Sequence, residues 1–427
     1  MNKTIQPLTA GSLDPHFGEA GVVNLNFVGQ GAGVAQGLSF TPDESIYVAG
    51  TSEGFSYVLS RHDQEGDPDG TFGTYDTFVS QGMVIGDFAT FDSSANAVQI
   101  LPDGKLILKG YARTVSGDYP AAACFSASGV LDKSFGTNGY VIFAPPFAKL
   151  NWTGFESAPL DPAGKIPGVA PPSAMCKIST GTRILVSARI DSKTALVSLD
   201  TKGALDTGFA GTGYVLVERG EPGVWLDVVH TLSGKLLVAG SKTKPGETVP
   251  HPFLARYYGD GTLDKSFGNQ GSITLDAVTG HFTDVVLMAG GKMVGVGYSV
   301  ETSRAKALLM GRNQDGSPDP AFNNGNPIIT SLDNAVSTWT SAAVASGGQM
   351  FVVTGGTYGA QSTSVVARFN RDGRPDTAFG TSGLVRLNLG THTYSGCVLV
   401  QRDQKIVTCG TAVHSDAVFG YVARFLG

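Results

Sequence analysis

Residues 261–267 read Gly-Thr-Leu-Asp-Lys-Ser-Phe, and the pattern Gly-x-[Leu/Pro]-Asp-x-x-Phe recurs seven times along the 427 residues. The Gly, the Asp and the Phe occur in every copy, and neighbouring copies are 55 to 74 positions apart. A repeat of this length is typical of tandem units that each form one small group of secondary-structure elements. The aspartates and phenylalanines of the pattern are Asp14, Phe17, Asp69, Phe72, Asp132, Phe135, Asp206, Phe209, Asp264, Phe267, Asp319, Phe322, Asp376 and Phe379.

The sequence between two copies carries four short β-rich runs. In the fourth unit these runs are residues 214–217, 226–232, 235–240 and 253–257, bounded by Gly, Pro and Ser. A short turn joins the second and third runs, which indicates antiparallel pairing. Seven units of four antiparallel strands predict an all-β fold, a seven-bladed β-propeller. An open solenoid is the alternative, but it would need atypical polar caps, and the terminal units resemble the interior ones.

The organisation of the chain follows from the closed ring. We expect a single β-propeller domain over residues 1–427. The last unit ends at residues 421–425 with no copy of the motif after it, so the N-terminal linking motif at residues 11–17 is expected to close the ring against the last blade. An insertion at residues 143–172 makes the third unit the longest.

The chain resembles the delta-60 repeat family of bacterial proteins. The resemblance rests on the seven copies of the motif and on turns such as Leu101-Pro-Asp-Gly-Lys-Leu-Ile-Leu108, followed by segments such as Lys235-Leu-Leu-Val-Ala-Gly240. It covers essentially the whole chain. The resemblance implies a propeller-like tandem array, and it implies no particular activity because the family has no settled one.

Composition and charge exclude several classes of protein. The chain has 58 Gly, each of which costs about 1 kcal/mol relative to Ala inside a helix, which argues against a helical bundle. The net charge is -6 and no run of Lys or Arg exceeds two residues, so we expect no nucleic-acid partner. There is no apolar run long enough for a membrane span and no secretory signal in residues 1–11. We expect a soluble monomer, cytoplasmic by default, with non-classical secretion as the alternative.

The cysteines and histidines indicate neither a metal nor a cofactor. The four Cys lack a C-x-x-C pair, and the seven His are scattered without metal-ligand spacing. We expect free thiols in the core. A bridge between Cys397 and Cys409, which lie in neighbouring predicted strands, is the alternative.

The repeated Asp and Phe are predicted to be structural. We place the motif between the last strand of one unit and the first strand of the next, where irregular backbone leaves N–H groups without partners. An Asp side chain accepts hydrogen bonds from N–H groups two or three residues further on, and a Phe ring fills space between blades. The alternative is that the seven carboxylates bind cations.

We expect the functional residues to lie at positions where the units differ. Aligning the units on the turn before the third run places Gln36, Asn96, Asp227, Asp284 and Ser341 in equivalent positions. Two residues earlier lie Trp225, Phe282 and Trp339, with Tyr394 close to the same position in the seventh unit. Residues two apart share one face of a strand, so we predict an arc of aromatic rings beside polar groups near one mouth of the ring. The alternative is that the rings pack between blades.

The insertion in the third unit is a second candidate site. It contains Trp152, Phe155 and seven Pro, and long ordered insertions on a rigid scaffold often bind ligands. The alternative is a lid that packs on its neighbours.

We therefore expect a non-catalytic binding protein that recognises a protein, a glycan or a small molecule, since aromatic rings beside polar groups suit such ligands. The alternative is an enzyme, a hydrolase or lyase at the mouth of the central tunnel, assisted by a metal or by Asp227 and Asp284.

Overall fold

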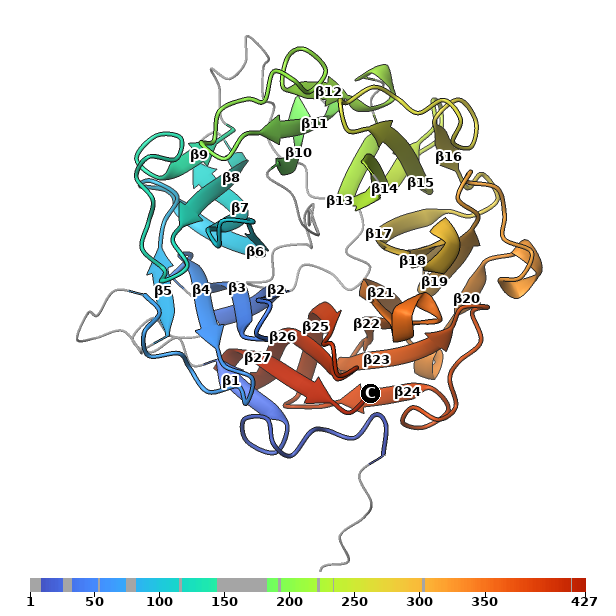
Figure 1. Ribbon diagram of the computed structural model, residues 1–427. Coiled ribbons are helices and arrows are strands. Elements are labelled where there is room, and N and C mark those ends of the chain that lie inside the picture. The colour runs from blue at the N-terminus through green and yellow to red at the C-terminus, as the bar shows by residue number, and fades with distance from the viewer. Residues whose placement is uncertain are drawn as a thin grey trace, which may run out of the picture.

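Seven antiparallel sheets stand around a central axis, so the protein is a seven-bladed β-propeller, as predicted (Figure 1). The fold was obtained as a computed structural model. It describes residues 9–25, 33–52, 54–73, 82–114, 117–143, 183–190, 193–220, 223–232, 234–301, 304–415 and 417–427. Six sheets have four strands, and the sheet of blade 3 has three among these residues.

We number the blades along the chain and the strands of each blade from the centre outward. The first strands are β2 (Gly33–Phe40), β6 (Asp92–Ile100), β13 (Val224–Leu232), β17 (Gly280–Leu287), β21 (Val336–Ala345) and β25 (His392–Val400), for blades 1, 2, 4, 5, 6 and 7. The second strands of blades 1 to 7 are β3 (Ile46–Ser52), β7 (Leu106–Thr114), β10 (Ile184–Ile190), β14 (Lys235–Thr243), β18 (Met293–Glu301), β22 (Met350–Tyr358) and β26 (Ile406–His414).

The outer half of each blade has shorter strands at its edge. The third strands are β4 (Tyr57–His62), β8 (Gly117–Phe125), β11 (Lys193–Leu199), β15 (Pro250–Tyr258), β19 (Arg304–Arg312), β23 (Thr363–Asn370) and β27 (Ala417–Phe425). The outer strands are β5 (Met83–Gly86), β9 (Tyr140–Ile142), β12 (Tyr214–Leu216), β16 (Ser272–Thr274), β20 (Ile328–Thr330), β24 (Leu384–Leu387) and, for blade 7, β1 (Val22–Leu25). Single-turn 3₁₀ helices occur at Val217–Gly220, Ala289–Gly291, Asn323–Gly325, Leu332–Asn334 and Ser346–Gly348.

Blade 7 is assembled from both ends of the sequence. Strand β1 pairs antiparallel with β27, with Val22 opposite Ala423, so its sheet has the order β1-β27-β26-β25 (Figure 1). The Asp14 N–H donates to the Arg424 carbonyl at 2.8 Å, as the Asp264 N–H donates to the Arg256 carbonyl in blade 4. The motif at residues 11–17 therefore occupies the same place in blade 7 as its copies occupy elsewhere.

The hydrophobic core lies between neighbouring sheets. One cluster joins Val294, Leu309 and Phe322 of blade 5 to Trp339 and Phe351 of blade 6, for example. Each blade therefore buries both of its faces against neighbours, which accounts for strands that are apolar along most of their length. Cys124, Cys397 and Cys409 are buried free thiols, as predicted.

A β-bulge recurs in the first strand of the blades in which that strand is described. In blade 5 the register shifts between Phe282 and Asp284, and in blade 6 between Trp339 and Ser341. Beside the bulge the two strands approach closely, and a Cβ on Gly297 would overlap the carbonyl oxygen of His281. The small residue near the middle of most second strands is explained by this close approach.

Strand direction divides the connections between two faces of the ring. Because the strands alternate, the turns between first and second strands share one face with the motifs; we call it the repeat face. The opposite face, which we call the variable face, holds the connections from second to third strands and from each outer strand to the next blade. The motif joins the third and outer strands of one blade, as between β15 and β16, and not one blade to the next as the sequence suggested. The short run after each motif pairs with the strand before it.

Candidate functional site

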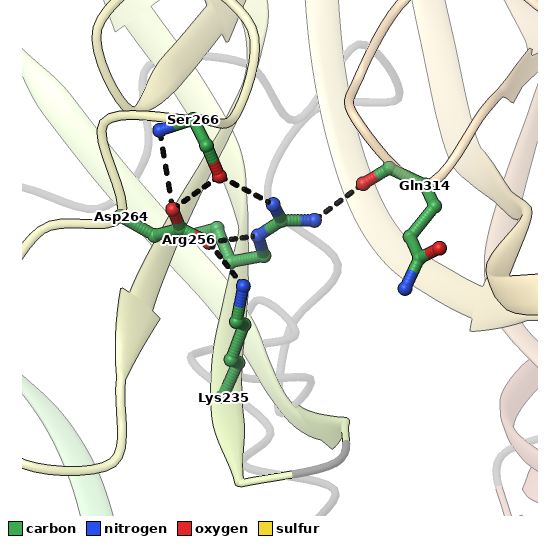
Figure 2. A network of polar contacts seen from close by, with 5 residues as sticks. All are labelled: Lys235, Arg256, Asp264, Ser266 and Gln314. Carbon is green, nitrogen blue, oxygen red and sulfur yellow. Dashed lines mark hydrogen bonds and ion pairs between the residues drawn. The ribbon is translucent and has the colours of Figure 1, made fainter.

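The motif aspartate of blade 4 is the centre of a buried polar network (Figure 2). Asp264 is fully buried; its Oδ2 accepts from Lys235 Nζ at 2.8 Å and from Arg256 Nε at 2.7 Å. Its Oδ1 accepts from the N–H and the hydroxyl of Ser266, at 3.1 and 2.6 Å. The Arg256 guanidinium also donates to the carbonyl of Gln314 in blade 5, so the network connects two blades.

All seven motif aspartates pair with at least one cation. The cations come from two positions: the start of the second strand, and the residue of the third strand whose carbonyl accepts the Asp N–H. The first position supplies Lys105, Arg183, Lys235, Lys292 and Lys405 to Asp132, Asp206, Asp264, Asp319 and Asp14. The second supplies Arg61, Arg256, Arg368 and Arg424 to Asp69, Asp264, Asp376 and Asp14. Blades that lack a cation at one position have it at the other.

These contacts favour the ionised form of Asp264 and Asp132. Burial on its own would raise the pKa of Asp264, but hydrogen bonds from Lys235, Ser266 and Arg256 outweigh it and the pKa is lowered. For Asp132, the Lys105 ammonium and Ser134 lower the pKa to about 2. With N–H, hydroxyl and cationic donors already in place, the carboxylates have the contacts expected of structural groups, which supports the structural reading over cation binding.

The motif Phe and Gly form a joint between neighbouring blades. Phe267 is fully buried beneath the Arg256 guanidinium, whose carbon lies 4.6 Å from the ring centre. Gly316, which opens the motif of blade 5, packs on this ring: a Cβ there would lie 3.0 Å from Phe267 Cε2. Gly316 also has a φ of +90°, so both the close packing and the backbone conformation favour Gly there.

A closed series of backbone hydrogen bonds runs through the seven joints. In each blade the residue after the motif Phe donates its N–H to a carbonyl in the motif segment of the next blade, as Gly268 does to Asp315 at 2.7 Å. The other pairs are Gly18 with Glu65, Gly73 with Ser128, Gly136 with Lys202, Ala210 with Asp260, Asn323 with Asp372, and Gly380 with Ala10. The repeat face is therefore occupied by contacts that hold the blades to one another.

The four aromatic residues predicted to form an arc do not occupy equivalent positions on their strands, because the hairpin turn of blade 4 is shorter than that of blade 5 and the bulge of blade 7 is longer than the others. Phe282 and Trp339 each lie opposite the glycine of the second strand, at Gly297 and Gly355. Trp225 and Tyr394 lie one residue earlier, opposite Ser241 and Thr411. Successive residues point to opposite sides of a strand, so these four positions do not share a face.

Phe282 and Trp339 belong to the core between blades. Phe282 is 1% exposed and Trp339 is 2% exposed, and Trp339 meets Phe369 edge-on with ring centres 6.2 Å apart. We therefore withdraw both from the candidate ligand site and adopt the packing alternative for them. Side chains buried between two sheets have no surface to offer a ligand.

Asp284 also connects blades. Its Oδ1 accepts from the Val285 N–H and its Oδ2 from the Ala342 N–H of blade 6, both at 2.8 Å, and it is 1% exposed. We therefore withdraw Asp284 as a ligand or catalytic residue. The side chains of Trp225 and Asp227, together with Trp152, Phe155 and the insertion from residue 144 onward, lie outside the described residues.

Other features of the described residues offer little to a ligand or a metal. Within the described ranges, no group of three or more His, Cys, Asp or Glu side chains is placed to hold a metal ion. A pocket between blades 2 and 3, lined by Asn96, Lys109, Tyr111 and Ser187 among others, has a volume of about 10 Å³. That is room for about one water molecule, far below the few hundred Å³ of a metabolite site.

Tyr394 belongs to a different aromatic cluster, on the variable face. Its ring is nearly parallel to those of Tyr358 and His392, and we call these three side chains the aromatic strip. All three are partly exposed. Sequence reasoning missed Tyr358 and His392, although His392 precedes Tyr394 by two residues and Tyr358 ends the second strand of the preceding blade.

The fold defines the class, a β-propeller, and comparisons with known proteins agree. The model of the family "Domain of unknown function (DUF5122) beta-propeller" matches residues 233–267 and 348–379. No curated protein matches the sequence.

One solved structure supports the fold alone, and two others are similar at lower TM-scores. Drosophila Semaphorin 2a has a TM-score of 0.50 and 8% identity, with 95% of this chain and 74% of that chain covered. A glucose dehydrogenase has a TM-score of 0.40 and 11% identity, with 95% of this chain and 99% of that chain covered. The polysaccharide lyase Uly1 has a TM-score of 0.45 and 10% identity, with 94% of this chain and 91% of that chain covered. Among the described residues, no helix is long and apolar enough to cross a membrane.

Proposed function

We propose that the protein is a non-catalytic binding protein whose recognition surface lies on the variable face. The observation that carries the proposal is the aromatic strip, a set of partly exposed rings that the seven-fold repeat does not require. The repeat face is occupied by joints between blades, whereas aromatic rings that reach solvent are typical of binding surfaces. We also propose that the chain is one of the bacterial delta-60 repeat proteins, on the strength of its seven motifs.

The test is an unbiased binding screen against glycans, metabolites and peptides. It compares the wild-type protein with the double variant Tyr358→Leu/Tyr394→Leu, which removes two rings of the strip and keeps apolar side chains. Tyr258→Leu is the matched control, because Tyr258 is 42% exposed at the end of β15, on the repeat face. We expect ligands that bind the wild type and the control but not the double variant. The proposal fails if no class of probe binds, or if all binding is lost in the control instead.

A further inference from the structure

The three rings of the aromatic strip lie nearly parallel to one another and come from two blades. The rings of Tyr358 and Tyr394 have centres 6.2 Å apart and planes inclined by 19°. The rings of His392 and Tyr394 have centres 6.0 Å apart and planes inclined by 1°. Tyr358 ends β22 in blade 6, while His392 and Tyr394 lie two residues apart on β25 in blade 7. The aromatic strip therefore spans the boundary between these two blades.

Hydrogen bonds to hydroxyl groups hold the aromatic strip in place. Thr338 Oγ1 donates to Tyr358 Oη at 3.1 Å, and Ser362 Oγ lies 3.4 Å from His392 Nδ1. The Thr393 N–H donates to the Ser362 carbonyl at 2.8 Å, which ties the blade 6 connection to the start of β25. Because these contacts exist without a ligand, little ordering is needed when one binds.

A second layer of buried polar contacts supports Tyr394 from behind. The hydroxyl of fully buried Tyr421 lies 3.2 Å from the Tyr394 carbonyl and 3.1 Å from Ser364 Oγ. Ser364 Oγ in turn lies 2.6 Å from Ser395 Oγ. The backbone that carries the central ring of the strip is therefore fixed to β23 and β27.

The chemistry of the strip selects among ligands. Its two phenol rings have apolar faces, and their hydroxyls and the imidazole of His392 donate and accept hydrogen bonds. A pyranose ring matches this combination, because it has an apolar C–H face for stacking and hydroxyl groups around its edge. An anionic ligand is matched less well, since the faces of aromatic rings carry partial negative charge.

We infer that the aromatic strip binds a neutral saccharide, with pyranose rings stacked on Tyr358, Tyr394 and His392. The inference rests on the proposed function and adds to it the class of ligand and the place of binding. Binding of a neutral ligand does not depend on attraction between charges, so its affinity is expected to be nearly independent of ionic strength.

The experiment titrates the full-length protein by calorimetry with four neutral hexasaccharides, built from glucose in β-1,4 linkage, glucose in α-1,4 linkage, mannose and N-acetylglucosamine. An oligouronate, choline and a polybasic peptide are the charged comparators. We expect at least one neutral hexasaccharide to bind, with similar affinity at low and high salt. Tyr394→Leu should weaken that binding about tenfold or more through loss of stacking, whereas Tyr394→Phe, which keeps the ring, should bind within about threefold of the wild type. Tyr258→Leu serves again as the control, and melting temperatures establish that each variant is folded.

The outcomes separate the inference from the proposed function. If only a charged comparator binds, the saccharide inference is overturned and the proposed function stands. If a saccharide binds equally well to folded Tyr394→Leu and Tyr358→Leu, the binding place is overturned. If Tyr394→Leu does not fold, Tyr394→Phe and Tyr358→Leu decide the question by the same criteria. If no probe of any class binds, both proposals fail.

Discussion

The two faces of the ring differ in what they repeat. On the repeat face the same joint occurs seven times, with a motif Phe under the next motif segment and a backbone hydrogen bond to the next blade. On the variable face the blades present different side chains, such as the Tyr358 and Tyr394 rings in blades 6 and 7 and the Arg113–Asp118 pair in blade 2. The repeated residues make the contact that every blade needs with its neighbour. A binding site is therefore expected among the residues that are not repeated.

The largest expected effect is on the repeat face. Phe267→Ala removes a fully buried ring on which Gly316 packs and which Arg256 covers. We expect the free energy of unfolding to fall by about 3–5 kcal/mol, measured by urea titration. Phe55→Ala on the variable face is the control, because Phe55 is 44% exposed; it should change stability by less than about 1 kcal/mol. Similar losses in the two variants would remove the distinction between the faces.

An intermediate effect, and a dependence on pH, is expected for Asp132→Asn. The pKa of Asp132 is about 2 in the folded protein, against 3.8 ordinarily, so the carboxylate stabilises the fold above about pH 4. The stabilisation is lost as pH falls toward 2, where the folded form also takes up the proton. At pH 7 the variant should be less stable by about 1 kcal/mol, because the pair with Lys105 is partly exposed and screened. Urea titrations from pH 7 to pH 2 should show the two proteins converging; a constant gap across this range would contradict the assignment.

The smallest effect is expected for an ion pair on the variable face. Asp118 pairs with Arg113 at 3.1 Å, and both side chains are more than a third exposed. Asp118→Asn should lower the free energy of unfolding by less than about 0.5 kcal/mol. The same titration measures it. A loss as large as that of Asp132→Asn would show that ion pairs hold both faces alike.

The sequence predicted the number of blades because the joint between blades has fixed chemical needs. Gly, Asp and Phe recur at one spacing because each joint needs a left-handed backbone, a ring and a carboxylate. The cations that accompany the Asp were missed because they come from two alternative positions, such as Lys105 and Arg61. Neither position carries Lys or Arg in every unit, although the Lys of the Pro-Asp-Gly-Lys turn could have indicated the first position.

The candidate site was predicted less well because its alignment depended on register. Blades 4 and 5 have the same β-bulge, but their hairpin turns differ in length, and an alignment that is wrong by one residue moves every side chain to the other side of the strand. Counting back from the hairpin turn therefore placed Trp225 beside Phe282, whereas strand pairing places Trp225 one residue earlier. Aligning on the glycines of the second strands, Gly240 and Gly297, would have given the observed register. Tyr394 stayed in the candidate site only because Tyr358 and His392, on the neighbouring blade and the same strand, complete it.

The way blade 7 is completed has a consequence for chain connectivity. Its third strand and its motif meet through hydrogen bonds, from Gly11 N–H to the Leu426 carbonyl at 2.8 Å and from Leu426 N–H to the Ser12 carbonyl at 2.9 Å. In the other blades the polypeptide itself makes this connection. A circular permutant that joins residue 426 to residue 11 by a short linker and opens the chain within another motif segment would keep the same seven joints. The order in which the blades follow one another around the ring is thus independent of where the polypeptide is cut.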